Sequence, residues 1–191
     1  MLKFIALFFG TWYLLTLIFP GARSATKGVI KTIHTPTAQQ GLIDDTATVR
    51  HMMSIIRSHI NPSITVSGAA QIANAVMSAS RRFDLDPYLI LGVIYAESNA
   101  YVWAVNGGSL GLMQVMPRWW DGELRKQGII RKRDDYFNVE PAVMAGSFVL
   151  RLCLDRARGD VRKALDYYTG KANACYVKKV FVITSLKDGG R

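Results

Sequence analysis

The sequence contains few side chains of the kinds that bind metals or act as thiol nucleophiles. Its 191 residues include two cysteines, Cys153 and Cys175, and three histidines. The cysteines form no Cys-x-x-Cys pair and have no histidine nearby, so they do not make a zinc site. In an oxidising compartment they could form one disulfide, which would close a loop of about twenty residues and add roughly 3 kcal/mol of stability. Two buried free thiols are the alternative, and neither a metal nor a cofactor is expected.

Acidic residues are also scarce, because 14 aspartates and glutamates stand against 24 lysines and arginines and leave a net charge of +10. This excess favours an anionic partner such as nucleic acid, a membrane surface or the bacterial envelope. Nucleic acid is disfavoured, since the aromatic residues are not interleaved with the basic ones and no zinc-knuckle, basic-zipper or RNP pattern is present. Half of the residues are hydrophobic, which suits one compact domain with an additional segment.

The longest apolar run, Phe4–Phe19, is close to the N-terminus and ends at a Pro-Gly pair. Its length suits the core of a signal peptide or a tilted signal anchor. Small residues would permit cleavage after Ser24, whereas the positive charges that follow the run favour an uncleaved anchor. Residues 1–22 are therefore predicted to be a signal peptide or membrane anchor, which makes the membrane a partner.

Strand signals are weak and no internal repeat is found, so the predicted fold class is mainly α. Residues 23–65 begin as a polar, Thr-rich linker and contain one predicted helix, which Asn61-Pro62 stops. Residues 66–187 are predicted to form one helical domain, whose first helix Ser67 could cap. The helices expected in this domain cover about residues 68–83, 87–97, 141–158, 160–170 and 173–186.

The stretch LILGVIYAESNA, residues 89–100, joins an apolar helix to a carboxylate. Asp86 and Pro87 are typical of a helix start, and residues 88–96 have no polar face, so the helix is predicted to be buried all round. Glu97 shares a helical stripe with apolar residues. A carboxyl group there would lose its water, which raises its pKa and suits a general acid. The alternative is that Glu97 marks the helix end and faces solvent.

One motif in the next loop is misleading. Residues 107–111, Gly-Gly-Ser-Leu-Gly, match the G-x-S-x-G pattern of a nucleophile elbow. That motif requires a strand before it, a helix after it and a histidine later in the chain. A helix is predicted before this one, and His34, His51 and His59 all lie upstream. The match is therefore interpreted as accidental.

The residues on either side of this loop carry a more specific pattern. Glu97-Ser98 is followed by GLMQVMP at residues 111–117, and in this the sequence resembles the lysozyme-like lytic transglycosylases of the soluble-lytic (SLT) type. The segment NVEPAVMAGSFVLRLCL, with Asn138 and Gly146, looks like the family's Asn-then-Gly helix. ALDYYTGKANACYVKKV looks like its Ala-Tyr-Asn-Ala-Gly segment and the helix after it. The resemblance covers about residues 68–181.

The resemblance implies a lysozyme-like helical domain, preceded by the hydrophobic targeting or anchor helix, that acts on peptidoglycan glycan strands. It makes Glu97 the single catalytic acid/base, which would cleave the bond between N-acetylmuramic acid and N-acetylglucosamine and leave a 1,6-anhydromuramyl end. The substrate-binding residues that it implies are Ser98, Met113, Gln114 and Tyr168. Further candidates for sugar stacking are Trp103, Trp119 and Trp120, with core packing as the alternative.

Two departures from the family pattern concern sugar binding. The expected Ala-x-Ser appears as Ala104-Val105-Asn106, and Tyr168-Thr169-Gly170 stands where Tyr-Asn-Ala-Gly is expected. The second change puts one sugar contact in doubt, so the subsite preference can differ. Neither change removes the acid.

Two rival functions and the biological setting stay open. An inverting muramidase would need a second carboxylate about 6.5–9.5 Å from Glu97, and no acidic residue has a pattern that places it there. A noncatalytic envelope or virion component is disfavoured by the intact motifs. The expected location is the periplasmic side of the bacterial envelope, anchored in the inner membrane or exported, or a virion if the chain is from a phage. A larger secretion, conjugation or phage assembly is a further expected partner.

Overall fold

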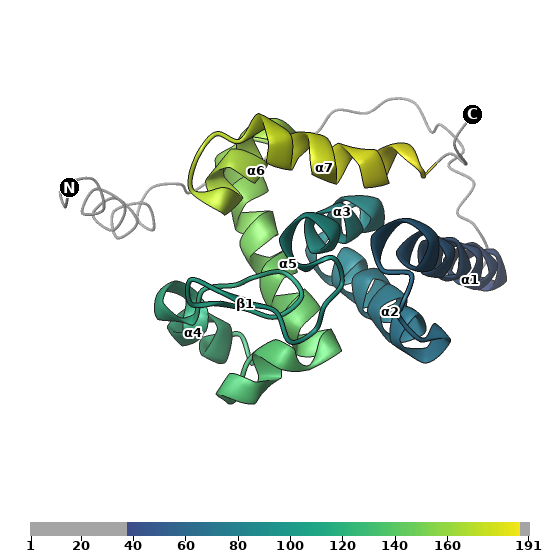
Figure 1. Cartoon of the computed structure of the whole chain (residues 1–191), viewed down its shortest axis with the longest axis horizontal. Coiled ribbons are helices and arrows are strands. Elements are labelled where there is room, and N and C mark those ends of the chain that lie inside the picture. Colours follow the sequence, from purple (N-terminus) through teal and green to yellow (C-terminus); the bar gives the residue numbers. More distant parts are fainter. Residues whose placement is uncertain (1–37, 188–191) are drawn as a thin grey trace, which may run out of the picture. The chain divides into compact units, whose positions relative to one another are not determined.

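A computed structural model describes the chain from residue 38 to residue 187, with side chains from residue 45 onwards. The elements in chain order are α1 (Ala38–Ile55), η3 (Ile56–Ile60), α2 (Val66–Phe83), α3 (Pro87–Ser98), β1 (Val105–Asn106), β2 (Ser109–Leu110), α4 (Pro117–Lys126), η4 (Arg133–Phe137), α5 (Val139–Arg156), α6 (Val161–Thr169) and α7 (Ala174–Ser185). The prediction of a mainly helical fold is confirmed (Figure 1).

The predicted signal peptide or anchor, residues 1–22, lies outside the described residues, so it stays a prediction. Among the helices of residues 38–187, none has the length and apolar character that crossing a membrane requires.

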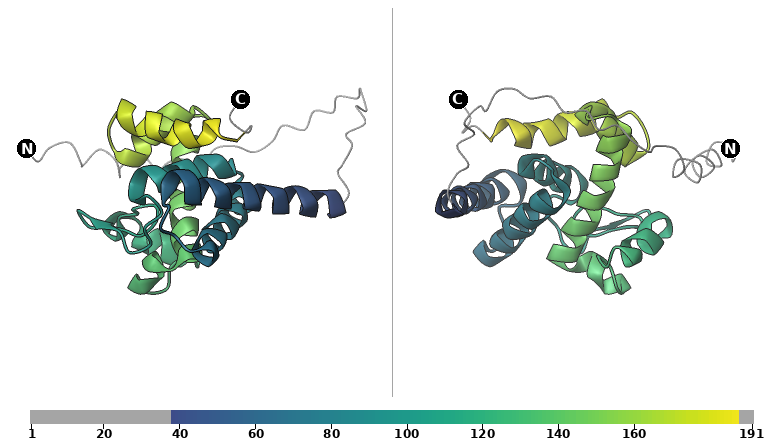
Figure 2. Two further views of the ribbon diagram at one scale, coloured as in Figure 1. Left: turned by 45° about the vertical axis from the view of Figure 1, so that its right-hand side comes forward. Right: turned by 180° about the vertical axis from the view of Figure 1, so that it is seen from behind.

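Helix α3 lies in the middle of the helical unit. It packs against α7 and α2, while α5 packs against α2 and α6 (Figures 1 and 2). Every residue from Tyr88 to Ile94 is buried, so the prediction of a helix buried all round is confirmed for this part, whereas Tyr95 and Ala96 are only partly buried. Its start is also as predicted, because Asp86 Oδ1 accepts a hydrogen bond from the Tyr88 N–H at 2.8 Å and Pro87 is the first helical residue.

Helix α1 packs against α2 and continues through η3, one turn of π-helix, to Ile60. The side chains of Met52 and Ile56 have no exposed surface and belong to the same core as α3. The helix expected within residues 23–65 is present and stops before Asn61, as predicted. It belongs to the same compact unit as the helices that follow, and the domain boundary at residue 66 stays a prediction.

The helix caps show where local prediction works and where it fails. Thr65, and not Ser67, is the N-cap of α2, because the Thr65 backbone is extended and its Oγ1 accepts a hydrogen bond from the Gly68 N–H at 3.0 Å. Helix α6 begins after Asp160 and ends at Gly170, whose φ of +75° is left-handed. Both bounds of α6 are as predicted.

Among the described residues, the regular strands are β1 and β2, which pair antiparallel with two residues each. Gly107 and Gly108 have positive φ and form the turn between them. The Gly-Gly-Ser-Leu-Gly stretch therefore belongs to a hairpin and not to a strand–turn–helix elbow. The interpretation of this motif as accidental is confirmed.

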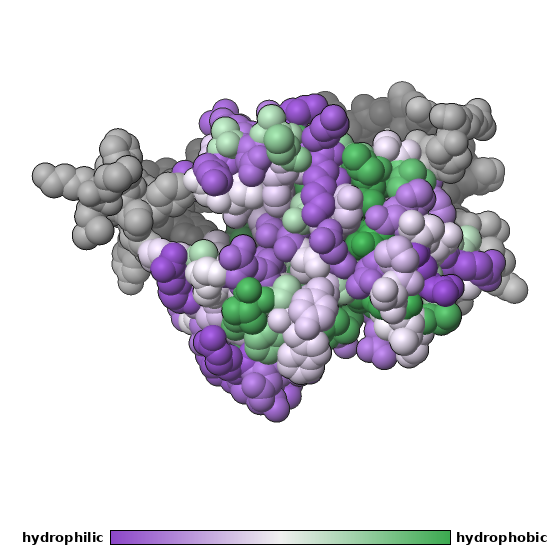
Figure 3. Space-filling model, viewed as in Figure 1, coloured by the Kyte–Doolittle hydropathy of each residue, from purple (hydrophilic) through white to green (hydrophobic). Residues whose placement is uncertain are grey.

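The surface of the helical unit is mixed, and on the face shown in Figure 3 hydrophilic residues separate smaller groups of hydrophobic ones. Most of the large hydrophobic residues that stay exposed lie in one segment after α3. They are Tyr101, Trp103, Val105 and Trp119. Exposed apolar side chains gathered in one segment are candidates for contact with a ligand.

Candidate active site

Glu97 lies in the last turn of α3, where the helix leaves the core, and its side chain is half-buried. Burial raises the pKa of its carboxyl group from 4.5 to about 7, while a hydrogen bond from Tyr176 and the positive charge of Lys179 act in the opposite direction. About half of the molecules therefore carry a protonated Glu97 near neutral pH. The predicted desolvated acid is present, and the alternative of a fully solvated helix end is wrong.

Two side chains of α7 face the end of α3. The Tyr176 hydroxyl donates a hydrogen bond to Glu97 Oε1 at 2.8 Å. Burial, followed by the negative charge of Glu97, raises the pKa of Tyr176 far above its ordinary value, so this hydroxyl keeps its proton. Lys179 Nζ donates to Asn99 Oδ1 at 3.0 Å and to the Ala96 carbonyl at 3.4 Å.

Tyr176 and Lys179 are functional candidates that the sequence reasoning missed. They lie three residues apart, on one face of α7, within a segment that resembles the family. Their position on one helix face was the signal in the sequence that could have pointed to a shared role. Their partner could not be read from it, because 79 residues separate Tyr176 from Glu97.

Ser98 and Gln114 hold the loop that follows α3. The Ser98 hydroxyl donates to the Leu112 carbonyl at 2.8 Å and also contacts the Ile94 carbonyl at 3.2 Å. Gln114, whose φ is +49°, donates from Nε2 to the Ala104 carbonyl at 3.0 Å and to the Gly111 carbonyl at 2.9 Å. Ser98 thus joins the Glu97 helix to the GLMQ segment, whereas Gln114 joins that segment to Ala104 within the loop. The contacts of both residues with sugar stay predictions.

Met113 and Tyr168 are brought together behind this loop. The Tyr168 hydroxyl donates to the Met113 carbonyl at 2.8 Å. Burial, followed by the negative charge of Glu97, raises the pKa of Tyr168 well above its ordinary value. The Met113 side chain has no exposed surface, and its sulfur contacts the Ser147 hydroxyl at 3.9 Å. The whole residue is buried and its carbonyl is bonded to Tyr168, so Met113 supports the loop from within the core, and its predicted contact with substrate stays a prediction.

Close packing requires glycine at two positions in the segments that resemble the family. A Cβ at Gly111, where φ is +72°, would collide with the Tyr136 carbonyl oxygen. A Cβ at Gly146 would collide with the Met113 side chain. These glycines let η4 and α5 approach the loop that lies beside Glu97.

The three candidate tryptophans occupy different environments. Trp103 is 62% exposed, and its ring stacks on Phe137 with centroids 5.3 Å apart. Trp119 is 44% exposed, with the Arg118 guanidinium 5.0 Å from its ring centroid. Trp120 is partly buried against the core. Core packing, which the sequence left open as the alternative role of these tryptophans, therefore applies to Trp120. Trp103 presents an open aromatic face.

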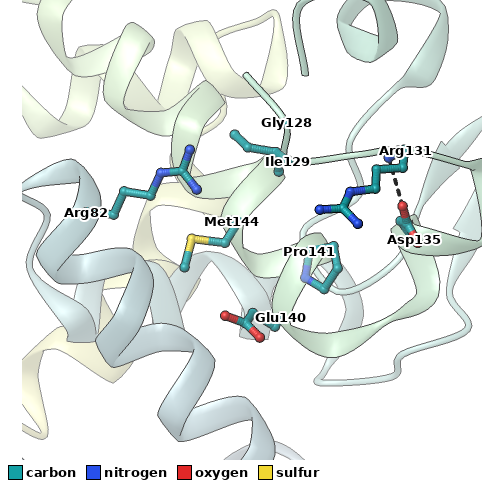
Figure 4. A pocket seen from close by; sticks show the side chains of 8 residues that line it. All are labelled: Arg82, Gly128, Ile129, Arg131, Asp135, Glu140, Pro141 and Met144. Atoms are coloured by element: carbon teal, nitrogen blue, oxygen red, sulfur yellow. Dashed lines mark hydrogen bonds between the residues drawn. The ribbon is translucent and has the colours of Figure 1, made fainter. Parts of the chain in front are cut away.

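A separate cavity of about 340 Å³ lies between the end of α2, the segment after α4 and the start of α5. Figure 4 shows Arg82 and Arg131 pointing toward it from opposite sides, with Glu140 and Met144 between them. None of the predicted site residues lines this cavity.

The cysteines of the described chain are free thiols, with Cys153 buried and Cys175 exposed. Burial raises the pKa of Cys153 to about 11, so it stays protonated near neutral pH. Within residues 38–187, no three His, Cys, Asp or Glu side chains are close enough together to hold a metal ion. The expectation that no cofactor is needed stays a prediction.

Together these features define a mainly helical domain that holds one desolvated carboxylic acid beside a tyrosine donor, which is the arrangement of a general acid. The family model described as "Transglycosylase SLT domain" matches residues 74–178, more than half of the chain. The chain belongs to this family, and the resemblance seen in the sequence is confirmed.

Among curated proteins, the chain is similar to the "Transglycosylase" of Enterobacteria phage PRD1. The two are 36% identical over 109 residues, which cover 56% of this chain and 38% of the phage protein. The chain thus spans well under half the length of that relative. No solved structure matches the chain.

Proposed function

We propose that the chain is a peptidoglycan lytic transglycosylase with a lysozyme-like fold. It cleaves the β-1,4 bond between N-acetylmuramic acid and N-acetylglucosamine and leaves a 1,6-anhydromuramyl end. The observation that carries this proposal is the carboxyl group of Glu97, whose pKa burial raises to about 7. Such a group can give up a proton and take one back near neutral pH, as one acid/base in both steps must do.

In the first step Glu97 gives its proton to the glycosidic oxygen, and the bond from muramic acid C1 to that oxygen breaks. The electron pair stays on the oxygen, which becomes the free 4-hydroxyl of N-acetylglucosamine. The 2-acetamido oxygen of the muramic acid stabilises the positive charge that develops at C1. Because Tyr176 donates to Oε1, the acidic proton is best placed on Oε2, which can face the substrate.

In the second step the C6 hydroxyl oxygen of the same muramic acid attacks C1 and displaces the acetamido oxygen. The Glu97 carboxylate takes the hydroxyl proton, which restores the acid and closes the 1,6-anhydro ring. No water is added, and the same carboxyl group acts once as acid and once as base.

The charges around Glu97 support this reaction over inverting hydrolysis, which needs a second carboxylate about 6.5–9.5 Å away. Among the described groups, those that shift the pKa of Glu97 by hydrogen bonding or charge are Tyr176 and Lys179, and neither is a carboxylate. Several acidic residues of the segment after Glu97 have partners of their own. For example, Asp121 pairs with Arg125 and Glu123 with Lys126.

The substrate contacts follow from the loop beside Glu97. Gln114 uses Nε2 to hold the loop, so its Oε1 is the end that can accept a hydrogen bond from the acetamido N–H. Trp103, backed by Phe137, offers its open face to a pyranose ring, since such a ring has an apolar face of C–H groups. Ser98 and Tyr168 shape the wall between them, and Met113 supports that wall from the core.

The biological setting that we propose is local opening of the cell wall for a larger machine. The similar protein is from a phage, which favours a virion-associated enzyme used during entry over a secretion or conjugation enzyme. In either setting the N-terminal hydrophobic segment would hold the enzyme at the membrane, on the periplasmic side of the envelope.

The test is mass spectrometry of the soluble fragments that the full-length chain, kept in detergent, releases from purified peptidoglycan. We expect anhydromuropeptides from the wild type and a loss of about 10²–10⁴-fold in Glu97→Gln. Glu123→Gln, a change of the same kind on α4, should keep full activity. Fragments with reducing ends would show a hydrolase instead. No release by the wild type would favour a noncatalytic component.

A further inference from the structure

One cation of α7 touches the residues on both sides of Glu97. Lys179 Nζ donates to the carbonyl of Ala96, directly before Glu97, and to the side chain of Asn99, two residues after it. The same ammonium group lies 4.4 Å from the centroid of the Tyr95 ring. These three contacts place Lys179 over the whole last turn of α3.

The turn that Lys179 contacts through the Asn99 side chain has an uncommon backbone conformation. Asn99 and Ala100 both have positive φ, +50° and +60°, although neither is glycine. Ala100 is buried, so its side chain is fixed in this strained turn. A cation at a helix C-terminus also interacts favourably with the unpaired carbonyl groups there. Lys179 therefore supports the turn that fixes where Glu97 points.

The charged and titratable groups around Glu97 come from three helices. Helix α7 contributes Tyr176 and Lys179, and helix α6 contributes Tyr168, on which the charge of Glu97 acts. From α5, Cys153 acts on both tyrosines. The tyrosines and Cys153 keep their protons near neutral pH, because burial raises the pKa of each. Among the described groups, Lys179 is thus the cation that acts on Glu97.

We propose that Lys179 is a positioning residue, which clamps the turn after α3 and supplies the positive charge that stabilises Glu97 as a carboxylate between the two steps. A half-buried carboxylate without a nearby cation is costly, yet the proposed reaction forms one each time Glu97 gives up its proton. The place of Lys179 in catalysis rests on the proposed function, whereas its effect on the acidity of Glu97 does not.

The chain offers a sharp test, because its only glutamates are Glu97, Glu123 and Glu140. In full-length protein labelled with ¹³C at the glutamate carboxyl groups, the Glu97 signal is the one that Glu97→Gln removes. Its titration gives the pKa of Glu97 directly. The basic limb of the pH profile of kcat/KM on peptidoglycan reports the pKa of the same group during catalysis.

The variants separate charge from contact. Lys179→Met removes both, Lys179→Gln keeps a hydrogen-bond donor without the charge, and Lys179→Arg keeps the charge. Lys178→Met, at the exposed neighbouring position, removes one charge without touching α3 and is the matched control. We expect Lys179→Met and Lys179→Gln to raise the pKa of Glu97 and move the basic limb to higher pH. Lys179→Arg should restore both, and Lys178→Met should change neither.

The proposal is overturned if the Glu97 titration is the same in Lys179→Gln and Lys178→Met. Lys179→Gln also decides the question if Lys179→Met does not fold. The proposed function can fail separately. A wild type that releases no fragments would refute the transglycosylase activity, whereas a raised pKa of Glu97 in Lys179→Gln would still support the link between Lys179 and Glu97.

Discussion

Helix α3 and the loop that follows it, residues 99–116, share one hydrophobic core but depend to different degrees on polar contacts. Residues Tyr88–Ile94 of α3 are buried on all sides by apolar neighbours. The loop has little regular structure, and only part of it, including Leu112 and Met113, is buried in the core. It is also fixed by side chains that bond to backbone carbonyls, among them those of Ser98, Gln114 and Tyr168. Apolar packing thus places the acid, and polar contacts together with a few buried residues shape the surface beside it.

Because of this difference, we expect the helix and the loop to control different properties of the protein. Desolvation by the packed helices is the largest cause of the raised pKa of Glu97, so changes that touch the end of α3 should alter acidity. No hydrogen bond or charge from residues 99–116 is among the causes that shift the pKa of that carboxyl group. Changes in the loop should therefore alter stability and sugar binding while the pKa of Glu97 stays as it is.

The loop is most sensitive at Gly111. Gly111→Ala would require a left-handed alanine and a shift of the Tyr136 backbone, which we expect to cost about 2–4 kcal/mol of unfolding free energy. Gly122→Ala is the control, since its Cβ would meet open space on helix α4, and a gain of about 0.5–1 kcal/mol is expected. Denaturant unfolding of both variants checks this. An equal effect of the two changes would contradict the packing described for the loop.

The helix end can be probed through the dependence of stability on pH. The pKa of Glu97 is about 7 in the folded protein and 4.5 in the unfolded chain, so between these values the folded state keeps a proton that the unfolded state has lost. Stability therefore falls as pH rises through this window. Above pH 7 the loss is about 2–3 kcal/mol.

Glu97→Gln has no proton to lose at this position, so it should be more stable than the wild type by about 3 kcal/mol at pH 8. The two proteins should be equally stable near pH 4.5. Thermal or denaturant unfolding across this range measures the difference, with Glu123→Gln as the control. A difference that does not change with pH would show that Glu97 is not desolvated.

Tyr176→Phe removes the hydrogen bond to Glu97 without changing the shape of the ring. Because that bond lowers the pKa of Glu97, its loss should move the basic limb of the pH profile to higher pH. Near pH 6 we expect kcat/KM to fall about tenfold, which corresponds to about 1.4 kcal/mol. Tyr167→Phe, on the neighbouring helix α6, is the control. A pH profile shared by the two variants would argue against the role of Tyr176.

The smallest effect is expected for Ser98→Ala. It removes the hydroxyl that joins α3 to the Leu112 carbonyl, and we expect a loss of about 1 kcal/mol in unfolding free energy. The pKa of Glu97 should not change, because Ser98 is not among the groups that shift it. Ser58→Ala, an exposed hydroxyl on η3, is the control. A shifted Glu97 titration in Ser98→Ala would mean that the loop and the helix do not control separate properties.

Local signals in the sequence predicted much of the helical framework. The Asp86-Pro87 start of α3, the bounds of α6 and the position of Glu97 depend on caps and on periodicity within a few residues. The cap of α2 was placed wrongly, because Thr65 and Ser67 are both able to cap. The backbone conformation that selects Thr65 depends on how the chain enters the helix, which no single residue reveals.

The parts that could not be predicted are contacts between distant segments. Tyr176 and Lys179 reach the end of α3 only because α7 packs along it. The burial of Met113 arises likewise from Gly146 on α5, so a motif residue that resembles a cleft residue in the sequence is a packing residue in the fold. Periodicity shows that a helix has an apolar face, but it does not identify the neighbour of that face.

The measurement that tests the account most directly is the ¹³C titration of the Glu97 carboxyl group in the full-length wild-type chain. Desolvation at the end of α3 predicts a pKa of about 7, with a normal titration returning only on unfolding in denaturant. A folded-state pKa near 4.5 would mean that the group is ionised near neutral pH. It would contradict the claim that the packed helix keeps Glu97 ready as an acid.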